Sequence, residues 1–173
     1  MAFGSSIQRA VDGAETVTLW LARHWLALAN SAFLLALLGA MAVPTMRWGG
    51  LHEPADLLFR AYQLVCHQQP ERSFFLLGYP MAFCQRDVAT YGSLALAGLL
   101  FARFRGTISP LPWRWYLLSL VPMGIDGLTQ LFGLRESCWE LRLLTGGLFG
   151  ITTAWLAYPY LDRFSKAVLE TQP

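Results

Sequence analysis

The sequence predicts an all-α integral membrane protein: a bundle of about four transmembrane helices, with an amphipathic N-terminal helix and a short interfacial or re-entrant helix. Hydrophobic residues make up 55% of the 173 residues and charged residues only 14%, whereas soluble domains usually carry about 25% charged residues. Four apolar segments each have roughly the 20-residue length that crosses the hydrocarbon layer as a helix. Trp and Tyr residues flank several of them, as expected for side chains at the headgroup layer.

The first element is predicted as an amphipathic helix over residues 5–22, lying on the membrane surface. Its apolar positions recur with a helical period, and its polar positions lie elsewhere on the helix. The apolar set is Ile7, Val11, Ala14, Thr18 and Leu21, and the polar set is Gln8, Arg9, Asp12 and Glu15. We therefore divide the chain into an N-terminal helix (1–24), a four-span membrane domain (25–161) and a polar C-terminal tail (162–173).

The first predicted span runs from about Trp25 to Pro44 and contains no charged residue. Charged residues precede it (Arg9, Asp12 and Glu15) with no apolar core before residue 25, so we expect it to be retained rather than removed as a signal peptide. Residues 55–66 predict a helix too short to span, with Asp56 near its positive N-terminus. The remaining spans are predicted at about 88–104, 115–132 and 141–161, each rich in Gly or apolar residues.

The basic residues predict the orientation in a prokaryotic inner membrane. An even number of spans places both termini and the connection near residues 105–114 on one side. Four arginines on the other side stand beside acidic residues and are expected to pair inside the protein: Arg72, Arg86, Arg135 and Arg142. Discounting them places both termini in the cytoplasm. The loops that carry Cys66, Cys84 and Cys138 then face the outer compartment, which permits disulfides.

A dense polar cluster interrupts the apolar sequence and is the first candidate site, because polar groups near lipid are energetically expensive. Its metal-ligating residue types are Cys66, His67, Cys84 and Asp87. Zinc binds Cys sulfur, His nitrogen and carboxylate oxygen in a tetrahedral shell, so zinc or another divalent metal is the candidate cofactor. A Cys66–Cys84 disulfide and a pair of inert thiols are the alternatives.

The second candidate site is a set of polar residues suited to binding anions. It comprises Arg72, Arg86, Asp126, Gln130, Arg135 and Arg142. Guanidinium groups bind carboxylates and phosphates through paired hydrogen bonds. An intramembrane carboxylate such as Asp126 is a functional candidate by default, and Gln130 lies on the same helix face. The alternative is that these arginines pair internally with acidic residues and only hold the loops to the bundle.

Several segments in order resemble a family of predicted prokaryotic membrane proteins of unknown function. They are CHQQPERS at residues 66–73, CQR at 84–86, DGLTQ at 126–130 and RLLTG at 142–146. The resemblance covers about residues 57–151 and implies an integral membrane domain. Family members carry a Cys-x-Arg-Cys segment, in which Asp87 here replaces the second Cys. A three-Cys metal site would therefore need Cys138, although Asp can also ligate zinc.

We hypothesise that the polar residues form one metal-binding site at a membrane face. One alternative is a non-catalytic accessory subunit or assembly factor of a larger membrane complex, such as a respiratory or photosynthetic one. A second alternative is a membrane enzyme acting on a lipid or quinone. The expected partners are the lipid bilayer and other membrane subunits, and the net charge of +2 gives no reason to expect nucleic acid.

Overall fold

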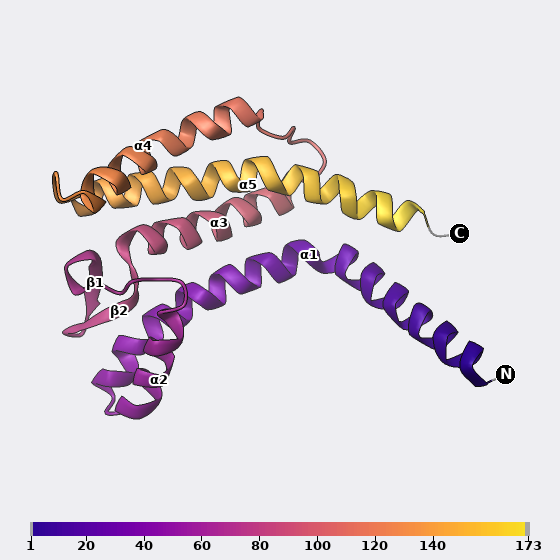
Figure 1. Ribbon diagram of the computed structural model, residues 1–173, viewed down its shortest axis with the longest axis horizontal. Coiled ribbons are helices and arrows are strands. Elements are labelled where there is room, and N and C mark those ends of the chain that lie inside the picture. Colours follow the sequence, from indigo (N-terminus) through magenta and orange to yellow (C-terminus); the bar gives the residue numbers. More distant parts are fainter. Residues whose placement is uncertain (1, 172–173) are drawn as a thin grey trace.

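The computed structural model describes the backbone of residues 2–171 and the side chains of residues 12–171. This part of the chain is mostly helical, with five α-helices, one short 3-10 helix and one two-stranded hairpin. The all-α prediction therefore holds for most of the chain but missed the hairpin. Figure 1 shows α3, α4 and α5 running side by side, with α1 along the flank of α3.

α1 (Ala2–Trp48) is one continuous helix where two separate elements were expected. It joins the predicted surface helix to the first predicted span and continues past Pro44. The side chains of residues 1–11, including Ile7 and Val11, lie outside the described part, so their amphipathic pattern stays a prediction. Residues Asp12–Trp48 are long and apolar enough to cross a membrane, with a mean hydropathy of 2.1 over an 18-residue window. Only 17% of that window is buried, unlike the core helix of a soluble protein.

The segment after α1 forms a short helix and then the unpredicted hairpin. α2 (His52–Tyr62) begins and ends earlier than the predicted 55–66 helix. A 3-10 helix (Pro70–Arg72) leads into β1 (Ser73–Leu76), which pairs antiparallel with β2 (Tyr79–Cys84). The turn between the strands places Leu77 and Gly78 at positive φ, 54° and 83°. Such turns match the right-handed twist of paired strands.

The other three long helices each begin slightly before the spans predicted for them. They are α3 (Gln85–Arg103), α4 (Trp113–Leu131) and α5 (Trp139–Glu170). α5 continues through most of the predicted C-terminal tail, whose residues 172–173 lie outside the described range. Buried Asp162 anchors this extension, because it pairs with Arg105 and with Lys166 Nζ at 2.8 Å. Among the described helices, only α1 passes the length-and-apolarity test for a span, so four spans are not established.

Close contact between α3 and α5 depends on two glycines spaced one helical turn apart. A Cβ atom at Gly146 would collide with the backbone carbonyl of Arg86, and one at Gly150 would lie 2.6 Å from the carbonyl of Thr90. Small residues at this spacing let helix backbones approach closely in membranes. Glycine at these positions therefore sets the distance between the two helices.

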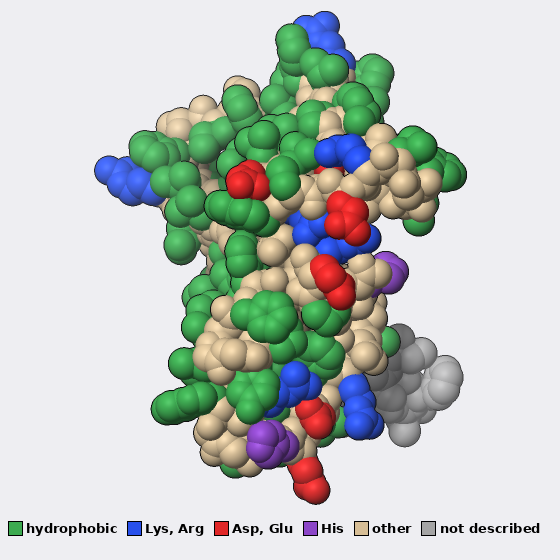
Figure 2. Space-filling view, turned by 90° about the vertical axis from the view of Figure 1, so that its left-hand side faces the viewer, with side chains coloured by type: hydrophobic (Ala, Val, Ile, Leu, Met, Phe, Trp, Pro, Cys, Tyr) green, Lys and Arg blue, Asp and Glu red, His purple; other side chains and the backbone are tan. Residues whose placement is uncertain are grey.

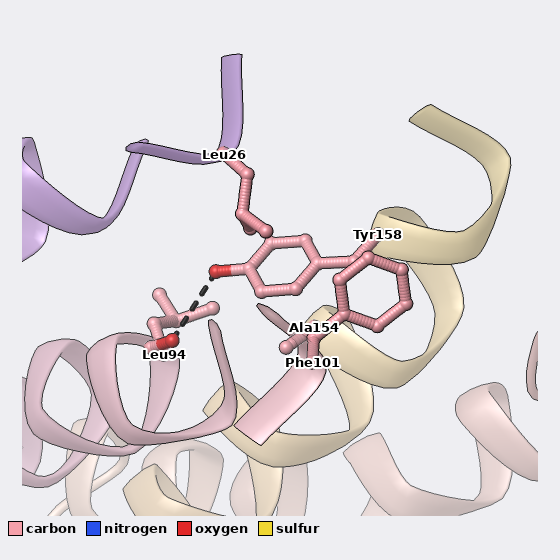
Figure 3. Close-up of a cluster of buried hydrophobic side chains, with 5 residues drawn as sticks. All are labelled: Leu26, Leu94, Phe101, Ala154 and Tyr158. Atoms are coloured by element: carbon pink, nitrogen blue, oxygen red, sulfur yellow. Dashed lines mark hydrogen bonds between the residues drawn. The ribbon is translucent and has the colours of Figure 1, made fainter. Parts of the chain in front are cut away.

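A buried apolar cluster joins α1, α3 and α5 in the middle of the molecule (Figure 3). Leu26 of α1, Leu94 and Phe101 of α3, and Ala154 and Tyr158 of α5 form it. Tyr158 Oη donates a hydrogen bond to the Leu94 carbonyl at 3.2 Å, so the polar tip of this buried ring is satisfied.

The two ends of the bundle differ in what they carry. Figure 1 shows both chain ends directed to one side, and the hairpin, α2 and the α4–α5 connection gathered on the opposite side. The loops with Cys66, Cys84 and Cys138 therefore lie at the same end of the molecule, which we call the hairpin end.

Candidate functional site

A cavity of about 480 Å³ opens at the hairpin end, where the segment after α2, the start of α3 and the later part of α4 meet. Eight of the ten predicted site residues line it: Cys66, His67, Arg72, Cys84, Arg86, Asp87, Gln130 and Arg142. Figure 2 views the molecule from this end and shows basic and acidic side chains gathered across its middle, between hydrophobic ones. The fold thus brings most of the two predicted polar sets to one place.

Asp126 is the buried centre of an ion-pair network behind this cavity. Its side chain is 1% exposed, although it lies in an otherwise apolar helix. Arg135 Nη2 donates to Asp126 Oδ1 at 2.7 Å, Ser137 Oγ donates to Oδ2 at 2.9 Å, and Arg86 Nη2 also donates to Oδ2. The network ties α3 and the α4–α5 connection to α4. Internal pairing therefore accounts for Arg86 and Arg135.

Arg142 is held differently, by neutral acceptors. It is 6% exposed, and its Nη1 donates to Gln85 Oε1 at 3.0 Å and to the Glu71 carbonyl at 3.3 Å. Its Nη2 donates to the Ser137 carbonyl. Arg142 thereby joins α5 to the 3-10 helix and to the first residue of α3.

Gln130 lies between two of the guanidinium groups. Its amide is assigned with the oxygen toward the arginines, because the nitrogen would otherwise face only donors. In this orientation the oxygen accepts from Arg142 Nη2 and from Arg72 Nε, each at 3.2 Å. Gln130 and Asp126, which the sequence predicts on one helix face, thus each contact two arginines.

Cys66, Cys84 and Asp87 form a compact group of possible metal ligands. One ligand atom from each lies within 4.8 Å of the other two. Cys84 Sγ donates to Asp87 Oδ2 at 3.2 Å, and the backbone N–H of Cys84 donates to Cys66 Sγ at 3.2 Å. The close pair follows from local structure, since Cys84 ends β2 and Asp87 lies in the first turn of α3.

Two predicted candidates lie outside this group. His67 is exposed and lines the same cavity, but it is not a member of the cluster of ligand atoms. Cys138, the candidate replacement for a third Cys, is exposed at the N-terminus of α5 and also lies outside the cluster. The ligand set that the fold assembles is therefore smaller than the predicted one.

The three cysteines are free thiols in the structure. The pKa of the Cys66 thiol is raised, mainly by its hydrogen bond with the Cys84 thiol and secondly by burial. The same interaction lowers the pKa of Cys84, against the opposing effect of burial. Cys84 is therefore the first of the pair to become a thiolate, which is the form that binds metals.

Two glutamines that the sequence analysis did not select hold this site in place. Gln68, at a positive φ of 51°, donates through Nε2 to the Phe59 carbonyl at 2.7 Å and to the Ala82 carbonyl at 3.2 Å. This fixes the loop that carries Cys66 against α2 and β2. Buried Gln85 accepts from Arg142 and reaches the Ser73 carbonyl at 3.4 Å. Their only sequence signal was their position next to the Cys and His residues.

Comparison with known proteins relates a large part of the chain to a protein family. Residues 66–156, slightly more than half of the chain, match a family described as predicted membrane protein (DUF2085). An uncharacterized protein of Methanocaldococcus jannaschii is 43% identical over 105 residues, which cover 59% of this chain and 67% of the relative. Another, of Methanothermobacter thermautotrophicus, is 35% identical over 99 residues, covering 55% of this chain and 86% of the relative. No solved structure matches the chain significantly.

Proposed function

The chain belongs to the DUF2085 family of predicted membrane proteins, and on this premise we propose that it is a multi-pass inner-membrane protein whose hairpin end binds a divalent metal ion. Cys66, Cys84 and Asp87 are the proposed ligands. The observation that carries the proposal is the mutual approach of their three ligand atoms within 4.8 Å beside a cavity.

Four spans are the topology that best accounts for α1, α3, α4 and α5. α3 and α4 have 19 residues each, so each is about 28 Å long at 1.5 Å per residue, close to the roughly 30 Å hydrocarbon layer. The charged residues Asp126 of α4 and Arg142 of α5, which reduce the apolarity of these two helices, are internal, because both are buried. Large apolar residues cover the outside instead: Leu96, Leu99, Leu117, Leu118, Ile125, Leu128, Leu144 and Ile151 are exposed. Lipid would bury this surface.

The ligand types favour zinc or a similar borderline-soft ion. Zinc–sulfur bonds of about 2.3 Å at tetrahedral angles place two ligand sulfurs about 3.8 Å apart, within the spread of the three ligand atoms here. Two thiolates and a carboxylate would satisfy three of four tetrahedral positions. The fourth would face the cavity, the arrangement typical of zinc sites with an open coordination position.

Metal content of the purified full-length protein tests this proposal. We expect about one equivalent of metal per chain after extraction in detergent without added chelator, and its loss in Cys66→Ser. Cys138→Ser is the matched control, because Cys138 is an exposed free thiol outside the cluster; it should keep the metal. Absence of stoichiometric metal from the wild type, or equal metal in both variants, would overturn the proposal.

The same preparations discriminate the alternatives. A Cys66–Cys84 disulfide would make the intact mass of the unreduced protein two hydrogens lighter and would leave the metal content at background. An accessory subunit would co-purify with stoichiometric membrane partners after mild extraction. A metal-bound protein that runs as a single component supports the site and argues against the accessory role.

A further inference from the structure

The cavity at the hairpin end carries more positive than negative charge. Three guanidinium groups line it, from Arg72, Arg86 and Arg142, but only one carboxylate does, from Asp87. Asp126 lies nearby and pairs with Arg86, but it shares its charge with Arg135. Arg72 and Arg142 form no ion pair with any carboxylate in the part of the chain that the structure describes.

The charge of Arg142 is the least compensated. The side chain is almost completely buried, and its acceptors are two glutamine oxygens and two backbone carbonyls. Within the described range, its Nε and the Nε of Arg86 are buried with no hydrogen-bond partner. Arg72 and Arg86 also lie close enough to repel the Arg142 charge. A buried cation among like charges is unfavourable unless an anion accompanies it.

The donors converge from separate elements. Arg72 ends the 3-10 helix, Arg86 lies in the first turn of α3, Arg142 lies in the first turns of α5, and all three face the same cavity. The guanidinium groups of Arg72 and Arg86 offer N–H donors that match the oxygens of phosphate. The Nη donors of Arg142 already bond to protein acceptors, so Arg142 contributes its positive charge. A tetrahedral anion with four oxygens can use several forks at once, whereas a carboxylate has two oxygens.

We propose that this cavity binds a phosphate group through hydrogen bonds from Arg72 and Arg86 and through the uncompensated charge of Arg142, either as free phosphate or as the headgroup of an anionic lipid. The proposal goes beyond the metal site, because it uses none of the three metal-ligand residues. Both sources present the same chemistry, and the hairpin end would lie near the headgroup layer in the four-span topology.

Binding of inorganic phosphate to the chelator-treated full-length protein in phosphatidylcholine nanodiscs tests the proposal. The wild type should bind phosphate, and Arg72→Gln should weaken binding by about tenfold or more, as expected for loss of a charged hydrogen-bonding partner. The Arg72 side chain is half-buried, and among the described residues it hydrogen-bonds to Gln130 alone, so this variant should fold. Arg60→Gln, an exposed arginine of α2 outside the cavity, is the matched control and should bind as the wild type does.

A second arm identifies the source of the phosphate group. Nanodiscs that also contain phosphatidic acid should compete with inorganic phosphate if the site holds a lipid headgroup, and native mass spectrometry should then detect retained lipid. Unchanged phosphate binding assigns the site to free phosphate. The proposal is overturned if neither ligand binds, if Arg72→Gln and Arg60→Gln behave alike, or if binding requires the metal, since the anion would then ligate the metal rather than the arginines.

Discussion

Asp126 ties together three side chains from other parts of the hairpin end. It lies in the middle of an apolar helix and satisfies two guanidinium groups and one hydroxyl from other elements. Burying a carboxylate is favourable only with such partners. The network explains why a buried Asp is tolerated in an otherwise apolar helix without being a catalytic group.

Replacing Asp126 by Asn should strongly destabilise the protein. The change leaves Arg86 and Arg135 without their counter-charge, and breaking a buried pair typically costs about 3–5 kcal/mol of unfolding free energy. Unfolding by denaturing detergent, followed by circular dichroism, measures it. Asp56→Asn is the control, because its pair with Arg47 leaves the Asp56 side chain 49% exposed and such pairs contribute about 1 kcal/mol or less. Equal losses in both variants would contradict this account.

The sequence identified the polar residues better than it identified their contacts. The spacing of Ser137 and Glu140 predicts a capping box at the start of the last span. In the structure Cys138 is the N-cap, without a side-chain cap, and Ser137 donates to Asp126 instead. Local spacing cannot show that a carboxylate from another helix competes for the same hydroxyl. The grouping of Cys66 with Cys84 and Asp87, but without His67, depends equally on tertiary structure.

The long helices could be predicted from the length of the apolar segments, whereas the hairpin could not. Residues 73–84 contain aromatic and apolar residues that suit strands as well as helices, and no Asn-Gly or Asp-Gly turn marks their centre. The continuous α1 was missed for a different reason. A change from amphipathic to fully apolar sequence predicts two environments, but it does not require a break in the helix between them.

The glycine contact between α3 and α5 gives a prediction with a neighbouring control. Gly146→Ala should destabilise the protein by about 1–3 kcal/mol, because its Cβ would overlap the Arg86 carbonyl and push the helices apart. Gly147→Ala has nothing within 4 Å of the new Cβ, so it should be neutral or slightly stabilising through helix propensity. Unfolding in denaturing detergent compares them. A larger loss for Gly147→Ala would disprove the close-packing argument.

The cysteine-bearing loops and the two chain ends lie at opposite ends of the bundle. Both termini extend to one side, and the cysteine-bearing loops gather at the other (Figure 1). The sequence predicted this common end because an even number of spans returns the chain to the same face. Which membrane face it is depends on the balance of basic residues. Of the four arginines predicted to pair with acidic residues, Arg86 and Arg135 pair with Asp126, whereas Arg72 and Arg142 form no ion pair within the described residues.

Labelling of Cys138 tests the proposed orientation. In the double variant Cys66→Ser/Cys84→Ser, Cys138 is the remaining native cysteine, and it is exposed. It should react with a membrane-impermeant maleimide added to intact spheroplasts, which reaches the outer face of the inner membrane. Glu170→Cys in a chain with all three native cysteines changed to Ser should react only after lysis, because the proposed topology places it in the cytoplasm. The opposite labelling pattern would invert the topology, and labelling of both before lysis would show that α5 does not cross the membrane.

Metal-edge X-ray absorption of the purified, metal-loaded protein counts the ligand atoms of the proposed metal site. Coordination by Cys66, Cys84 and Asp87 predicts two sulfur scatterers at about 2.3 Å and the rest oxygen or nitrogen at about 2.0–2.2 Å. Cys66→Ser should lower the sulfur count, whereas Cys138→Ser should leave the spectrum unchanged. A shell of oxygen and nitrogen alone, or a sulfur count that does not depend on Cys66, would contradict the proposed site.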